Sequence, residues 1–136
     1  MKAFGVSFAT AVPLGKDAMP IRELREAGLE VICGADSVTD WGDCFGARDI
    51  LQKANEIARI QYRSTEFELS RALGYATRFV SPPNDKGEQV WPKAGDAASF
   101  SRPPVASSAE AVARLPARSA VFHKGRLAYG GLPKAG

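Results

Sequence analysis

Asp36 is the residue of this sequence that is best placed to do chemistry. It follows the short apolar run Leu29 to Cys33 and a glycine, Gly34, which is how a buried strand ends when it presents a side chain to a site. A carboxylate there could bind a ligand or transfer a proton. An Asp just past a strand also forms ordinary turns, because its side chain bonds the backbone two residues on. From these residues alone both interpretations stay open.

Other residues that bind metals or attack substrates are scarce. The two cysteines, Cys33 and Cys44, form neither a CxxC pair nor the even framework of a small secreted domain, which favours a reducing cytoplasm. The single histidine, His123, falls in a predicted C-terminal strand, far along the chain from Asp36. We expect it to be a partly exposed strand residue and not a ligand.

The elements before Asp36 predict where it lies. The apolar segment Phe4 to Val12 predicts a strand, at about residues 4–11, that stops at Pro13. A helix at about 19–27 follows, with Pro20 in its first turn and Gly28 ending it, and then a strand at about 29–34. Such a βαβ unit joins parallel strands, and ligand-binding groups gather at their carboxyl ends.

Two longer helices are predicted next, at about 48–62 and 65–79. The first repeats apolar residues at helical spacing and has Asp49 in its first turn, where the helix dipole favours a negative charge. The second begins with a capping-box pattern formed by Thr65 and Glu68, and Pro82-Pro83 prevents it from continuing. We expect the helices to cover the parallel pair on one side only.

The amino-acid composition changes after Pro82, where Pro, Gly, Asp and Ser become frequent. A short helix is predicted at 109–114, strands at 97–101, 119–123 and 126–129, and a hairpin turn at Lys124-Gly125. The chain therefore divides into residues 1–81 and a small β segment, residues 82–136, that ends in a frayed tail. The expected fold class is α/β.

Charge and length limit the partners. The net charge of +3 comes from 18 basic and 15 acidic residues spread along the chain, so nucleic acid is not the favoured partner. The N-terminal apolar run is too short to span a membrane and is followed by no convincing cleavage site. We expect a cytoplasmic protein without membrane contact.

Several segments, in order, resemble the C-terminal end of the amidohydrolase superfamily, in its cytosine-deaminase-like branch. These are metal-dependent hydrolases built on a (β/α)8 barrel. The segments are Phe4 to Leu14, Arg22 to Val31, the loop Gly34 to Trp41 with Phe45-Gly46, Lys93 to Phe100, and Val121 to Leu127. The sequence departs from the family at Ala98, where an acidic residue is usual.

The resemblance implies a fold and a site. The fold would be a partial (β/α)8 barrel, consisting of the last two β/α units and C-terminal helices, followed by a small β domain. Asp36 would be the catalytic carboxylate of the eighth strand and a ligand of a divalent metal, zinc or iron, and Trp41 would line the substrate pocket. The family's metal-binding histidines are absent from this sequence, so we expect the chain alone to bind metal poorly and to be inactive.

Three functions compete at this point. The first is the C-terminal part of an amidohydrolase that hydrolyses C–N bonds other than peptide bonds, by deamination of a small nucleobase-like substrate or cyclic amide. The second is a non-enzymatic binding or assembly module derived from that fold. The third is a small anion-binding protein that uses Thr39 and loop amides near Asp36, although no Gly-rich phosphate loop supports it.

The first function implies a complementing N-terminal segment that supplies the remaining strands. Without a neighbour, the strand at Phe4 to Val12 would have an unpaired apolar edge, which predicts self-association. Replacing Phe8 with Lys is expected to improve solubility.

Overall fold

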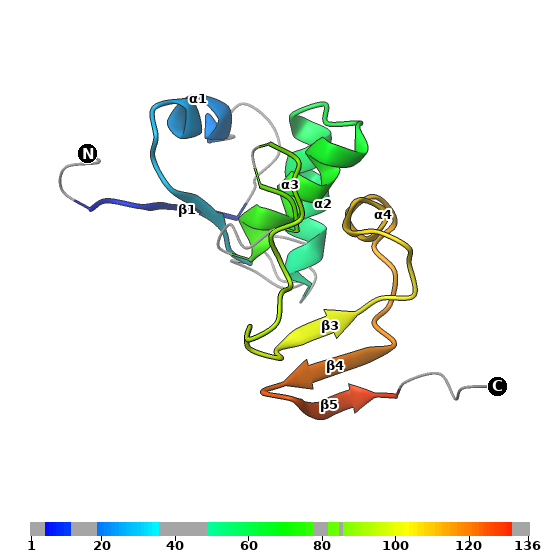
Figure 1. The fold of residues 1–136 in the computed structure, drawn as a ribbon. Coiled ribbons are helices and arrows are strands. Elements are labelled where there is room, and N and C mark those ends of the chain that lie inside the picture. Colours follow the sequence, from blue (N-terminus) through cyan, green and yellow to red (C-terminus); the bar gives the residue numbers. More distant parts are fainter. Residues whose placement is uncertain (1–4, 12–18, 36–48, 78–81, 85, 132–136) are drawn as a thin grey trace.

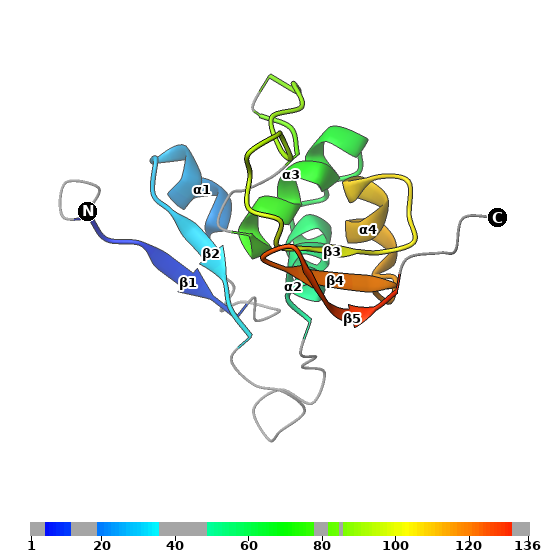
Figure 2. The ribbon, with the colours of Figure 1, turned by 60° about the horizontal axis from the view of Figure 1, so that its bottom comes forward.

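The computed structural model describes residues 5–11, 19–35, 49–77, 82–84 and 86–131. It has a mixed α/β structure with two separate sheets, one of two strands and one of three (Figure 1; Figure 2). The elements in chain order are β1 (Phe8–Thr10), α1 (Ile21–Glu26), β2 (Val31–Cys33), α2 (Ile50–Ile60), α3 (Glu66–Ala76), β3 (Phe100–Arg102), α4 (Ser108–Arg114), β4 (Ala120–His123) and β5 (Arg126–Gly130). None of the helices in these ranges is both long and apolar enough to cross a bilayer.

The predicted parallel pair is confirmed. Strands β1 and β2 run parallel with Thr10 opposite Cys33, and α1 connects them. Backbone hydrogen bonds continue past both ends of the pair, from Phe8 N to Glu30 O at 2.8 Å and from Gly34 N to Thr10 O at 2.9 Å. Each strand is three residues long, shorter than the apolar runs that predicted it.

Gly28 ends α1 as predicted. Its φ of 75° is in the left-handed region, where glycine has no steric penalty. The Gly28 N–H donates to Arg25 O at 2.8 Å and the Leu29 N–H donates to Leu24 O at 3.0 Å. This pair of bonds is a Schellman motif, which satisfies the last carbonyls of the helix and turns the chain directly into β2.

The two longer helices begin at side-chain caps. Asp49 accepts a hydrogen bond from Leu51 N at the start of α2. At the start of α3, Thr65 Oγ1 accepts from Glu68 N at 3.2 Å, and Glu68 Oε2 accepts from Thr65 N at 3.1 Å. The capping box predicted from the sequence is therefore confirmed, and these bonds satisfy amide groups that have no partner within the helix.

Two groups of buried side chains hold the elements together. A strand core joins Ile21, Val31, Ile57 and Tyr75. A helical core joins Leu51, Ala54, Ala58, Ala72, Ala111 and Val112. Helix α2 contributes to both cores, because Ile57 faces β2 and its neighbour Ala58 packs in the helical core.

Helix α4 belongs to the helical core although it comes late in the chain. Val112 is fully buried, and its carbonyl oxygen accepts a hydrogen bond from Asn55 Nδ2 at 2.8 Å. Ser108 Oγ donates to Ser70 Oγ on α3 at 2.9 Å. The segment after Pro82 thus supplies part of the packing of α2 and α3; the division at residues 81 and 82 stays a prediction.

The predicted hairpin, formed by β4 and β5, is confirmed, and β3 adds a third strand to it. Strand β4 pairs antiparallel with both β3 and β5. Lys124 and Gly125 both have positive φ, 48° and 77°, which is the geometry of a two-residue type I′ turn. Phe100 and Phe122 stack across β3 and β4 with ring centroids 4.9 Å apart.

The choice of Phe8 as the exposed residue of the N-terminal edge was wrong. Phe8 is half-buried and packs against the strand core, so a lysine there would lose apolar contacts and is expected to destabilise the fold. Val6, a large apolar residue just before β1, has 42% of its surface exposed. In the described part of the chain β1 pairs only with β2.

We therefore expect Val6→Lys, and not Phe8→Lys, to reduce self-association, because a charge on an edge discourages pairing with a second copy. Light scattering over a range of protein concentrations measures the effect. Val90→Lys is the matched control, because Val90 is 44% exposed and lies in a loop. Equal effects of the two substitutions would show that added charge, and not the edge, controls association.

Candidate functional site at the carboxyl ends of the parallel strands

The carboxyl ends of β1 and β2 lie side by side. Thr10 and Cys33 are opposed as the last residues of the two strands, and Thr10 is 6% exposed. The chain can be followed from Cys33 through Gly34 to Ala35. Asp36 and Trp41 lie outside the described residues, so their predicted roles stay predictions, but the strand that leads to Asp36 ends where the sequence placed it.

Cys33 is a protonated thiol at neutral pH. Burial raises its pKa to about 12, while the charge of Lys53 lowers it and that of Glu56 raises it. Cys33 is partly buried, and a neutral thiol attacks electrophiles slowly, because the thiolate is the nucleophile. Since the folded pKa lies above the ordinary value of 9.0, thiol burial stabilises the fold fully below pH 9, and this contribution is lost as the pH rises toward 12.

In a Cys44→Ser background, iodoacetamide should therefore modify Cys33 at pH 8 at least about tenfold more slowly in the folded protein than in urea. Mass spectrometry of timed samples measures the two rates. A small reference thiol, reacted with and without urea, corrects for the solvent. Equal corrected rates would contradict the burial of Cys33.

An ion pair with a buried lysine, missed from the sequence, lies beside this strand end. Lys53 is 3% exposed, and its Nζ bonds Glu56 Oε2 at 3.0 Å. Helix α2 packs on β2, and both charges act on the pKa of Cys33. A Lys and a Glu three residues apart are typical of an exposed helix face, so the pattern gave no signal of burial. A charge kept this far from water requires such a partner.

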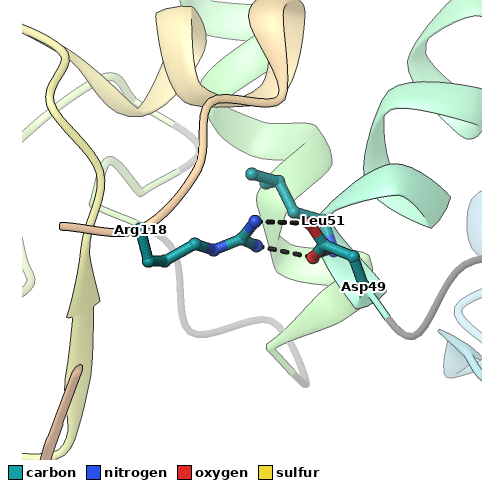
Figure 3. A network of polar contacts seen from close by, with 3 residues as sticks. All are labelled: Asp49, Leu51 and Arg118. Atoms are coloured by element: carbon teal, nitrogen blue, oxygen red, sulfur yellow. Dashed lines mark hydrogen bonds and ion pairs between the residues drawn. The ribbon is translucent and has the colours of Figure 1, made fainter. Parts of the chain in front are cut away.

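A second pair fixes the point at which α2 begins. The guanidinium of Arg118, just before β4, faces the Asp49 carboxylate and bonds both of its oxygens (Figure 3). Asp49 Oδ1 also accepts from Leu51 N at 3.0 Å. The fork of an arginine matches a carboxylate in this two-bond arrangement. These bonds connect Asp49, the residue after segment 36–48, to Arg118, which lies just before β4 of the three-stranded sheet.

The described residues do not form a metal centre. No group of three or more His, Cys, Asp or Glu side chains among them is arranged to hold an ion. His123 is exposed at the end of β4, opposite Arg126, as predicted for a strand histidine.

Comparison with known proteins extends these observations. No family model matches the chain. It is 48% identical over 125 residues to the uncharacterized protein YahJ of Escherichia coli (strain K12), an alignment that covers 92% of this chain and 27% of YahJ. The chain thus spans about a quarter of this relative.

Two solved enzymes share the fold over most of the chain. N-isopropylammelide isopropylaminohydrolase from Burkholderia multivorans ATCC 17616 matches with a TM-score of 0.71 and 26% identity, over 92% of this chain and 32% of the enzyme. 5-methylcytosine deaminase from Klebsiella pneumoniae, solved with 5-fluorocytosine, matches with a TM-score of 0.65 and 19% identity, over 98% of this chain and 36% of the enzyme. These structural neighbours are amidohydrolase-superfamily enzymes, which confirms the superfamily that the sequence motifs indicated, and the chain corresponds to about a third of their length.

Proposed function

We propose that this chain is the C-terminal part of a metal-dependent amidohydrolase that hydrolyses C–N bonds of a small cyclic amidine or amide, with deamination of a cytosine-like ring as the reaction. The match to N-isopropylammelide isopropylaminohydrolase over 92% of the chain carries the proposal. The parallel pair supports it, because β1 and β2 end side by side and Asp36 follows β2 in the sequence. Active sites of (β/α)8 barrels lie at the carboxyl ends of the strands.

The partial barrel, residues 1–81, would provide the last two strands and their helices, and the small β segment would follow it. The remaining strands would come from a complementing segment, as expected for a chain that spans about a third of its structural neighbours. That segment would also bring the histidines that the superfamily uses to hold zinc or iron. The metal, when bound, supplies an activated water.

Asp36 would move the proton in this reaction. The water oxygen forms a bond to the ring carbon that carries the amino group, and the carboxylate of Asp36 takes the proton that the water releases. The same proton then passes to the leaving nitrogen as the C–N bond breaks and ammonia leaves. The proton that remains on the former water oxygen moves to the neighbouring ring nitrogen, which gives the ring carbonyl. Trp41 would lie against the flat ring of the substrate, where an aromatic face offers apolar contact.

A hybrid enzyme tests the proposal. In this hybrid the chain replaces the matching region of YahJ, to which it is 48% identical. Ammonia release is measured with cytosine, 5-fluorocytosine and a panel of cyclic amides, for intact YahJ and for the hybrid. A substrate turned over by both proteins supports the proposal. A folded hybrid that is inactive on every substrate of intact YahJ would contradict it.

A further inference from the structure

The residues on either side of segment 36–48 are held by hydrogen bonds. Before the segment, the Gly34 N–H donates to Thr10 O at 2.9 Å, which continues the pairing of β1 with β2. After the segment, Asp49 Oδ1 accepts from Leu51 N at 3.0 Å, which makes Asp49 the cap of α2. The chain thus enters the segment from the end of the parallel pair and leaves it at the start of α2.

Arg118 holds the second of these points. Its two terminal nitrogens bond the two oxygens of the Asp49 carboxylate (Figure 3). Only 22% of the Arg118 side chain and 32% of the Asp49 side chain are exposed. Two parallel bonds between partly shielded groups fix the carboxylate more firmly than an ion pair on the open surface does.

The backbone beside Arg118 is itself held in place by the three-stranded sheet. The N–H and Oγ of Ser119 donate to the carbonyl oxygen of Arg102, the last residue of β3, at 2.9 and 2.8 Å. Ser119 O accepts from Gly131 N, just past β5, at 3.1 Å. An added Cβ at Gly130 would lie 1.9 Å from Ser119 O, so the strands approach closely here. Arg118 therefore extends from a firm support.

We propose that Arg118 is a positioning residue of the hydrolysis site, because it fixes Asp49 and so the point at which segment 36–48 ends. This role rests on the proposed function, in which that segment supplies Asp36 and Trp41. A loop whose ends are both held has fewer conformations to lose. Placement matters greatly in catalysis, since an error of about 1 Å in the position of a reacting group can cost about 10²-fold in rate.

Limited digestion of the purified chain with trypsin tests whether Arg118 holds Asp49. Trypsin cleaves after Arg48, and this cleavage requires the first residues of α2 to leave the helix, so its rate follows the population of the opened state. Arg118→Gln should raise this rate at least about fivefold. Arg118→Lys, which keeps the charge but loses the fork, should lie between. Mass spectrometry of timed samples measures the rates.

Two controls separate a local effect from a general one. Arg126→Gln removes the same charge from the exposed strand β5 and should leave cleavage after Arg48 unchanged. Cleavage after Arg71, within α3, reports opening of the rest of the fold in the same samples. The absence of any acceleration in Arg118→Gln, or an equal acceleration after Arg48 and Arg71, would overturn the proposal.

The hybrid enzyme tests whether this contact supports the site. Asp49→Asn removes the charge but keeps a good helix cap. Arg118→Gln should lower kcat/KM for ammonia release at least about tenfold by itself, but less than about twofold when Asp49→Asn is already present, because residues that act through one contact are not additive. Arg126→Gln should change kcat/KM by less than about twofold.

A loss of the same size in both backgrounds would show that Arg118 does not act through Asp49, and a loss below about twofold in the unmodified hybrid would show that the site does not need the pair. Either result overturns the positioning role. A hybrid that is inactive before any substitution would overturn the proposed function and this role with it, even where the trypsin rates show that Arg118 holds Asp49. The two failures are therefore distinguishable.

Discussion

In the hybrid enzyme, Asp36→Asn should reduce turnover by about 10²- to 10⁴-fold and leave folding unchanged. Asparagine has nearly the same shape and can form the same turn, but it cannot accept the proton of the attacking water. General acid–base catalysis contributes about this factor. The rate of ammonia release at saturating substrate measures the loss, and circular dichroism checks the fold.

Asp43→Asn makes the same chemical change elsewhere in the segment 36–48 and should leave turnover within about threefold. The same small change for Asp36→Asn would end its catalytic assignment, because about threefold corresponds to well under one kcal/mol of activation free energy. Asp36 would then be the ordinary turn residue that its position after a strand also permits.

Ile57→Ala should lower the free energy of unfolding of the chain by about 2–5 kcal/mol. Ile57 is fully buried between α2 and β2, so truncation leaves a cavity lined by residues of both elements. Urea unfolding followed by circular dichroism gives the change in midpoint. The loss is a large part of the total stability of a domain of this size.

Ile60→Ala is the matched control, because Ile60 ends the same helix with 36% of its surface exposed. Ile60→Ala should lower the free energy of unfolding by less than about 1 kcal/mol, because folding removes less of the apolar surface of Ile60 from water. Equal costs for the two variants would mean that α2 does not pack on β2 through Ile57.

Local sequence signals predicted the elements of the fold well. The capping box at Thr65, the glycine after α1 and the turn at Lys124-Gly125 each depend on the conformation of a few neighbouring residues. The prediction of each feature therefore does not depend on the elements that pack around it. The same is true of the parallel pair, because two apolar runs joined by a short helix have few other topologies available.

Features that depend on distant contacts could not be predicted. The burial of Lys53 follows from its place between α2 and the strand pair. The half-burial of Phe8 follows from which face of a three-residue strand meets the strand core. The hollow lined by residues of α1 and α3 exists because these two helices, about 40 residues apart in the sequence, come together. The position of Asp36 after a strand made it a candidate, but its catalytic role and the role of Trp41 come from family resemblance, because an Asp after a strand has several uses.

The position of α4 limits where gene rearrangement can divide such a protein. Val112 fills a gap between helices that precede it by about 40 to 60 residues. A gene rearrangement that separated these helices from α4 would leave two products, each with apolar surface exposed that the other normally covers. Recombination between related genes should therefore tolerate junctions in the loop that follows α3 poorly.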